Sequence, residues 1–312
     1  MGFTPRCGLE IQPGPWRTDN VDAQFFVLAA NSGALQALCD RYLNVHGTPG
    51  TRFEPVAPVV ALSFQNIHDL RSTSPHATQD IGHTYQEAAW WVMVQDRNKP
   101  ADPVRLMVPF IFLNNTVALA TGREIYGYPK EFADVQIPPP GGIFSVTGLA
   151  NQSMGAGIVA NPSTLMFEAK PLLSGLSAGI GISGLGPNIL VALSDPAEFD
   201  RFSFALEVAA VVKLLLGGQL DFIFLRQFTD FSSGTPAYRQ HLVAAPCQIR
   251  RNSFHLQLTP YQVAIPALAT HPFVNQLGLV TLPIGTAHQS VAIPLLAMSI
   301  GMAFELGLPA PL

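Results

Sequence analysis

The chain has 312 residues, a formal net charge of −4 at pH 7, 48% apolar residues and only 12% charged residues. The length is ample for a sizeable core, and the charged share is about half of the roughly 25% usual in globular domains. The sequence has no basic run and no interleaved aromatic and basic residues, which excludes a nucleic-acid-binding protein. So few charges cover a monomer poorly, and we therefore predict a homo-oligomer that buries apolar surface between subunits.

The predicted elements, in chain order, are an N-terminal arm at 1–20, a helix at 35–43, a strand at 55–64, a polar loop at 69–82, strands at 84–94 and 104–113, a short helix at 114–121, a turn at 138–142, strands at 143–150, 154–160 and 163–169, a helix at 202–216 that ends at two glycines, and strands at 219–228 and 241–258. Strands dominate and do not alternate regularly with helices. This order predicts an α+β fold with a mainly antiparallel, barrel-like sheet and a few flanking helices. We see no internal repeat and no linker, so one domain over residues 1–312 is expected.

The cysteines and the chain ends limit the cellular location. Cys7, Cys39 and Cys247 are widely spaced and odd in number. A disulfide framework or a zinc site needs pairs at short spacing, so the pattern favours a reduced, cytoplasmic protein. The N-terminus lacks the basic and apolar segments of a signal peptide. The apolar stretch Val291–Leu306 is shorter than a membrane span of about 18–20 residues and contains Pro294, so it is predicted to be a buried C-terminal helix without membrane contact.

Lys130 is distinctive among the chain's four lysines, since aromatic residues and Pro129 surround it in the sequence. Aromatic enclosure desolvates a lysine and disfavours its charged form. Only a neutral amine attacks a carbonyl, and at an ordinary lysine pKa near 10.4 about one amine in 2,500 is neutral at pH 7. Lowering such a pKa by about 4 units takes roughly 5.5 kcal/mol, which a closed apolar pocket supplies. Lys130 is therefore either a Schiff-base nucleophile or an ordinary loop lysine paired with Glu124 or Glu131.

The segment Gly122-Arg123-Glu124-Ile125-Tyr126-Gly127-Tyr128-Pro129-Lys130 resembles the motif of the acetoacetate decarboxylase family, which reads Gly-Arg-Glu, about three further residues, then aromatic-Pro-Lys. The resemblance implies the Schiff-base role for Lys130, because the lysine after the proline forms the imine in that family. It also implies the family's cone-like sheet.

Two further segments resemble the same family. Tyr85-Gln86-Glu87 is similar to its Tyr-x-Glu, whose glutamate lies in the active site. A weaker match runs from Leu225–Phe228 through Gly234-Thr235-Pro236 to His241–Val243. On strand alternation Glu87 shares a face with Tyr85, Ala89, Trp91 and Met93, so its carboxylate is expected to be buried and to need a partner. The alternative is a solvated carboxylate at a strand start.

The chain also departs from the family pattern. Many members carry a second lysine after the catalytic one, and here that residue is Glu131. If Glu131 pointed at Lys130 it would favour the ammonium, so we expect it to face away, or Arg123 to supply positive charge. The family's N-terminal arginine has no clear equivalent near Asp22–Phe26, and its other active-site glutamate falls near Ser63–Gln65, where there is no acid. These differences concern acetoacetate as the substrate rather than the lysine chemistry.

The resemblance implies a carbon–carbon lyase that decarboxylates a β-keto acid, acetoacetate or a bulkier relative, through Lys130 without a metal or organic cofactor. Glu87 would position the substrate or relay a proton. Arg123 would counter the substrate carboxylate, hold the loop, or form a structural ion pair with Glu124. The pocket lining is expected to include four aromatic residues: Tyr126, Tyr128, Phe132 and Trp91. Alternatives are an aldolase or dehydratase of the same superfamily acting on a keto acid, and a non-catalytic small-molecule-binding protein.

Competing motifs lack their structural context. Gly175-Leu176-Ser177-Ala178-Gly179 fits the nucleophile elbow of hydrolases, and the overlapping glycines at 179, 181 and 184 fit a dinucleotide-binding fingerprint. Both need a following helix, and the Gly- and Pro-containing residues 180–187 make a poor one. The scattered histidines, including His76 and His83, form no metal-binding motif, and we interpret them as solvated loop residues.

Overall fold

The computed structural model describes residues 12–47, 49–77, 81–155, 157–159, 161–172, 218–228, 239–257, 259–282 and 288–312. Several predicted features lie outside these residues: Cys7, the helix at 202–216, the glycine motifs between 175 and 184, and the loop with Gly234-Thr235-Pro236.

The described elements are β1 (Trp16–Ala29), α1 (Ser32–Cys39), the π-helical turn η1 (Asp40–Asn44), β2 (Phe53–Pro55), β3 (Val59–Ser72), β4 (His83–Asp96), β5 (Arg105–Leu113), α2 (Thr116–Thr121), the π-helical turn η2 (Gly122–Tyr126), β6 (Lys130–Gln136), β7 (Phe144–Ala150), β8 (Asn161–Pro171), β9 (Gln219–Phe228), β10 (Arg239–Leu256), β11 (Tyr261–Pro266), α6 (Phe273–Leu277), β12 (Gln289–Ala292), β13 (Leu296–Leu306) and β14 (Ala310–Pro311).

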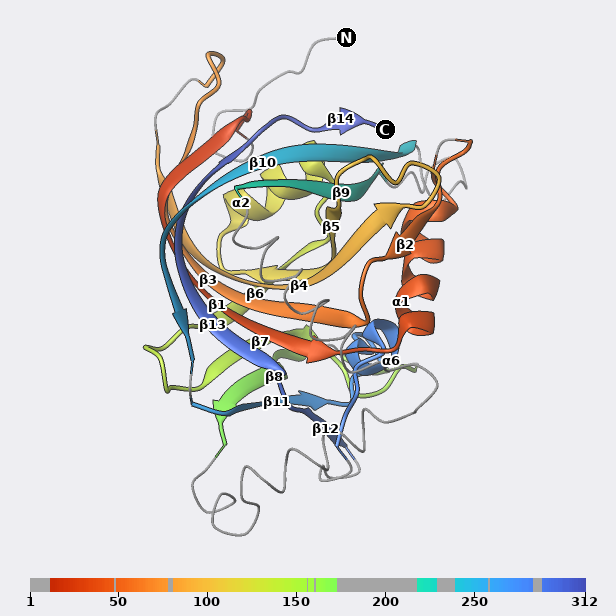
Figure 1. Cartoon of the computed structure of the whole chain (residues 1–312). Coiled ribbons are helices and arrows are strands. Elements are labelled where there is room, and N and C mark those ends of the chain that lie inside the picture. Colours follow the sequence, from red (N-terminus) through yellow and green to blue (C-terminus); the bar gives the residue numbers. More distant parts are fainter. Residues whose placement is uncertain are drawn as a thin grey trace.

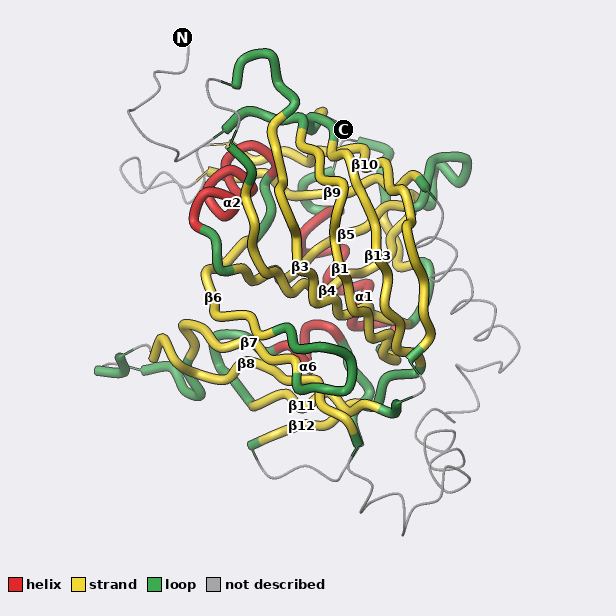
Figure 2. Tube along the Cα trace, turned by 90° about the vertical axis from the view of Figure 1, so that its left-hand side faces the viewer, coloured by secondary structure: helices red, strands yellow, loops and turns green. Residues whose placement is uncertain are grey.

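Seven of these strands close into a ring (Figure 1). The hydrogen-bonded order is β5-β9-β10-β13-β1-β3-β4, and β4 pairs again with β5. The pairings are antiparallel except those of β5 with β9 and with β6. The predicted α+β fold with a mainly antiparallel, barrel-like sheet is therefore confirmed. Helix α2 is enclosed by the curved strands in Figure 1 and lies at their edge in Figure 2, so it covers one mouth of the ring.

Strand β6 connects the ring to a second group of strands (Figure 2). Its first residues pair with β5, with Lys130 opposite Ile111, whereas Ala133–Gln136 pair with β7. Beyond β7 the order continues through β8 and β11 to β12. The chain thus leaves the ring within β6, and Lys130 lies on the ring side of that transition.

The long strand β4 contributes to two separate cores. Trp90 packs in the layer between the ring and the second strand group, where its ring centroid lies 5.3 Å from that of Phe167. Trp91 faces the interior of the ring, and its centroid lies 5.5 Å from that of Phe222. Because successive strand residues face opposite sides, the interior face carries Tyr85 and Glu87, while Ala88 faces the other core.

Four predicted boundaries or elements are wrong. The apolar segment within 291–306 is not a helix: Leu296–Leu306 forms β13, which lies between β1 and β10 and is paired on both edges. Both faces of this strand carry mostly small or apolar residues, so it resembles a buried helix in sequence. Strand β1 begins at Trp16 inside the expected arm, and β3 runs to Ser72 inside the expected loop. The described part of 154–160 is not a strand.

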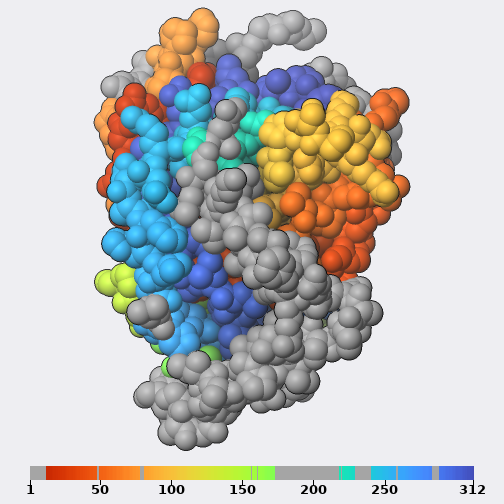
Figure 3. Space-filling model, in the orientation of Figure 1, coloured from red at the N-terminus to blue at the C-terminus, as the bar shows by residue number. Residues whose placement is uncertain are grey.

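Large apolar side chains are exposed around β6, β7 and the connection to β8: Phe132, Ile143, Leu149, Met154, Ile158 and Val159. A second subunit would cover such a surface, so the homo-oligomer remains a prediction. Figure 3 shows one face of the molecule, on which the light-blue segments near residues 240–280 lie to the left and the orange and yellow segments near residues 50–110 lie to the right. Among the described residues, no helix has the length and apolar character needed to cross a membrane.

Candidate active site

A cavity of about 110 Å³ lies inside the ring. Its walls come from strands on all sides and from α2, and most of its lining is apolar or aromatic. The polar side chains that line it are Gln65, His83, Tyr85, Glu87, Thr121, Tyr126, Tyr128 and Lys130, together with the indole N–H groups of Trp16 and Trp91 and the thiol of Cys247. Among the described residues that line the cavity, Lys130 is the only lysine or arginine, and Glu87 is the only residue with a carboxylate.

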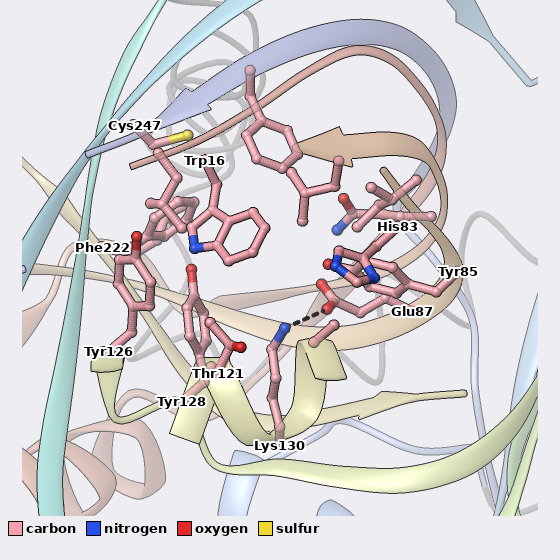
Figure 4. Close-up of a pocket in the computed structure, with 18 of the residues that line it drawn as sticks. Trp16, His83, Tyr85, Glu87, Thr121, Tyr126, Tyr128, Lys130, Phe222 and Cys247 are labelled. Carbon is pink, nitrogen blue, oxygen red and sulfur yellow. Dashed lines mark ion pairs between the residues drawn. The ribbon is translucent and has the colours of Figure 1, made fainter. Parts of the chain in front are cut away.

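Lys130 enters the cavity from the start of β6 (Figure 4). Its side chain is only 8% exposed. The preceding turn makes this possible, because Gly122 has no side chain: a Cβ there would lie 2.6 Å from Cδ and 2.8 Å from Cε of Lys130. Gly127 then reverses the chain with φ of 86°, and a Cβ at Gly127 would meet the Arg226 backbone. Both glycines belong to the segment that resembles the decarboxylase motif.

The Lys130 amine lies against the Glu87 carboxylate, with 3.1 Å between Nζ and Oε2 (Figure 4). The Glu87 side chain is 7% exposed, as its place on β4 predicts. The contact is within ion-pair distance, yet among the described residues Oε2 has no hydrogen-bond partner of acceptable geometry. We therefore interpret the contact as electrostatic rather than as a directed hydrogen bond. The alternative pairing of Lys130 with Glu124 or Glu131 is wrong.

Two tyrosine rings flank the amine. Nζ lies 5.1 Å from the ring centroid of Tyr128 and 5.7 Å from that of Tyr85. Burial raises the pKa of both phenols well above 10, and the nearby Glu87 carboxylate adds to the effect, so both hydroxyls keep their protons. Burial also lowers the pKa of His83 below 6.5 and leaves that imidazole neutral. The cavity wall around the amine is thus uncharged apart from Glu87.

Glu131 faces away from the cavity. Its Oε2 lies 3.0 Å from Nε2 of the buried His271, whose Nδ1 contacts Thr270 Oγ1 at 2.9 Å. The expectation that Glu131 does not oppose Lys130 is therefore confirmed. Lys130 and Glu131 are consecutive residues of β6, so their side chains point to opposite sides of the strand. The contact of Glu131 with His271 holds β6 from outside the cavity.

The other predicted site residues divide clearly. Tyr126, Tyr128 and Trp91 line the cavity, and Trp91 Nε1 donates to Ser63 Oγ at 2.8 Å. Phe132 does not line it: the residue is 56% exposed, because β6 leaves the ring there to join β7. Arg123 is also exposed; it lines a second hollow, which shares Tyr128 and Lys130 with the cavity, so its contact with a substrate carboxylate stays a prediction. Among the described contacts, no ion pair joins Arg123 to Glu124.

Several lining residues were not predicted, and two of them lie on β1, which the sequence did not reveal as a strand. Trp16 and Phe25 reach the cavity from β1, and Phe222 from β9. Gln65, directly opposite Glu87 on β3, occupies the region where the family has a second glutamate. Its Nε2 donates to Ser63 Oγ at 2.9 Å. Alternation along β1 would have revealed Phe25, whereas a register shift between Thr18 and Val21 changes the parity, so alternation does not give the inward direction of Trp16.

No group of three or more potential metal ligands occurs in the described part of the chain. The cavity offers a single carboxylate and one neutral imidazole, which are 6% and 7% exposed. These residues do not make a recognisable metal site.

Residues 34–153 match the family model for acetoacetate decarboxylase. This segment contains both Glu87 and Lys130. Residues 34–153 belong to the acetoacetate decarboxylase family. The structure of acetoacetate decarboxylase from Legionella pneumophila is similar over 99% of this chain and 92% of that one, with a TM-score of 0.54 and 16% identity.

A second acetoacetate decarboxylase structure is similar over 97% of this chain and 91% of its own, with a TM-score of 0.54 and 13% identity. No curated protein gave a significant sequence match. The acetoacetate decarboxylase fold thus extends beyond the matched segment, whereas identities this low establish the fold alone.

Gly122→Ala tests the space that the motif leaves for the lysine. The added Cβ would overlap the Lys130 side chain, so we expect the amine to be displaced and turnover to fall at least about tenfold, with a stability loss of about 1–3 kcal/mol from overpacking. An activity assay measures the fall in turnover, and thermal unfolding measures the loss of stability. Gly155→Ala is the matched control, because a Cβ there has its nearest neighbour at 3.6 Å. Unchanged turnover in Gly122→Ala would contradict the proposed position of Lys130.

Proposed function

We propose that this protein is a Schiff-base-forming carbon–carbon lyase that decarboxylates a β-keto acid through Lys130. The observation that carries the proposal is a buried amine, 3.1 Å from a single buried carboxylate, at the end of an apolar cavity. Acetoacetate decarboxylase family membership over the segment that holds both groups supports it. No cofactor is required, because the lysine itself supplies the electron sink.

The reaction begins with attack of the neutral Lys130 amine on the substrate ketone. Loss of water from the carbinolamine gives a protonated imine. The electron pair of the bond to the carboxylate then moves toward the imine nitrogen as carbon dioxide leaves, and an enamine results. Protonation of the enamine carbon restores the imine, and hydrolysis releases the ketone and the free amine.

Glu87 is the acid–base partner in this scheme. Its carboxylate lies 3.1 Å from Nζ, within reach to take the proton of the ammonium and to return it later in the cycle. That transfer leaves a neutral amine ready to attack and a carboxylic acid ready to give the proton back. The same acid can protonate the enamine carbon.

Reductive trapping tests the proposal. The protein is incubated with a ketone such as acetone and with borohydride, and the modified peptide is identified by mass spectrometry. We expect a single adduct, on Lys130. Carbon dioxide release from a panel of β-keto acids then distinguishes a decarboxylase from an aldolase or dehydratase that uses the same imine. A protein that gains no adduct at Lys130 is a binding protein rather than a Schiff-base enzyme.

A further inference from the structure

Two buried hydrogen-bond donors in the cavity have no acceptor among the described residues: the indole Nε1 of Trp16 and the hydroxyl of Tyr126. Trp16 is 4% exposed and Tyr126 is 1% exposed, and both line the cavity. Burial raises the pKa of the Tyr126 phenol well above 10, so the hydroxyl is protonated. A buried donor without an acceptor is unfavourable, so each of these groups calls for a partner such as a ligand atom or an ordered water.

The two donors lie together. Both lie close to Gly14: a Cβ atom added to that glycine would be 2.5 Å from the Tyr126 hydroxyl and 3.3 Å from Trp16 Nε1. Figure 4 shows them beside Cys247 and Phe222, whereas Glu87, Tyr85 and His83 form the opposite side of the cavity. The Lys130 amine is directed toward Glu87, away from this pair. The cavity therefore has a reacting end and a second, neutral polar end.

The chemistry of the second end selects its ligand. An indole N–H is only a donor, and the phenol can donate as well, so the group between them must be an acceptor. Burial raises the pKa of the neighbouring Cys247 thiol from 9.0 to about 12, so no thiolate competes there. Among the described lining residues the only lysine or arginine is Lys130. An anion at this end would be buried without a countercharge, which is strongly unfavourable.

The size of the cavity sets the length of the ligand. The cavity of about 110 Å³ is enclosed by side chains on all sides, so it takes a small ligand. Acetoacetate carries no oxygen beyond its ketone and carboxylate. A slightly longer substrate can span both ends.

We propose that Trp16 and Tyr126 form a specificity subsite for an uncharged oxygen, a hydroxyl or carbonyl, on the substrate chain beyond the ketone that reacts with Lys130. The substrate class is then a β-keto acid somewhat longer than acetoacetate, with one additional neutral oxygen. This inference rests on the proposed Schiff-base function and specifies its substrate. It makes these two side chains specificity-determining residues rather than catalytic ones.

Matched substrates test the subsite. One pair is 5-hydroxy-3-oxohexanoate and 5-methyl-3-oxohexanoate, and the other is 6-hydroxy-3-oxohexanoate and 3-oxoheptanoate; in each pair a methyl group replaces the hydroxyl at equal size. We expect kcat/KM for carbon dioxide release to favour one hydroxylated member by about tenfold or more. Tyr126→Phe and Trp16→Phe each remove one donor and should bring that ratio toward one, mainly by reducing the value for the hydroxylated substrate.

Tyr261→Phe is the matched control. It removes a buried tyrosine hydroxyl outside the cavity, where that oxygen accepts from the Gly141 amide at 2.7 Å, and it should leave the ratio unchanged. Equal rates within both pairs in the wild-type protein would overturn the subsite. So would variants that slow all four substrates by the same factor, because the donors would then hold the reacting carboxylate. Absence of both the Lys130 adduct and carbon dioxide release would instead reject the lyase, and an adduct and turnover without discrimination would reject only the subsite.

Discussion

Lys130→Met should reduce carbon dioxide release by a factor on the order of 10⁴ or more, to the level of the uncatalysed reaction, and should abolish borohydride trapping. Methionine keeps the length and apolar character of the side chain but has no nucleophile. No other lysine can replace it in the described cavity, since Lys130 is the only one among its lining residues. Residual trapping at another position would contradict the proposed mechanism.

The same substitution leaves the Glu87 carboxylate buried without its countercharge. Breaking a buried pair in this way costs about 3–5 kcal/mol, so a lost fold has to be distinguished from a lost nucleophile. The double variant Lys130→Met with Glu87→Leu removes both charges and should recover most of the stability, while remaining inactive. Lys99→Met, in an exposed turn, is the control for lysine removal itself and should change neither activity nor unfolding temperature.

The interior-facing side of β4 was predictable from sequence because it depends only on alternation. Once Thr84–Val94 is taken as a strand, Glu87 falls on an apolar face and must be buried. The position of Lys130 was predicted by resemblance to the decarboxylase motif, and local spacing alone left an ordinary loop lysine open. Its partner was not predicted, since the contact joins β4 to β6 through a ring closure that no local pattern encodes.

The errors share one physical cause. Strand β13 is paired on both edges, and its less buried face carries small or apolar residues such as Ala297, Gly301 and Ala303, so its sequence largely lacks the period of two that identifies a half-exposed strand. Phe132 illustrates the complementary limit: it has the same parity as Lys130, yet β6 passes from β5 to β7 at that point, and the residue becomes exposed. Tertiary pairing decides both cases, and it also brings Trp16 and Tyr126 together.

Glu87→Gln should separate imine formation from turnover. The amide is nearly isosteric but cannot take a proton from Nζ or deliver one to the enamine, so we expect kcat to fall by about 10²–10⁴. Borohydride trapping should persist, because the lysine remains in its apolar enclosure.

Glu131→Gln is the internal control for this experiment. Glu87 contacts the Lys130 amine inside the cavity. Glu131 is next to Lys130 in the sequence but contacts His271 outside the cavity. We expect Glu131→Gln to retain turnover within about threefold, since an amide oxygen can still meet the imidazole. If both variants lost activity equally, the defect would lie in the placement of β6 rather than in proton transfer. If neither lost activity, the 3.1 Å contact between Lys130 and Glu87 would have no part in the reaction, and the acid would have to be sought elsewhere.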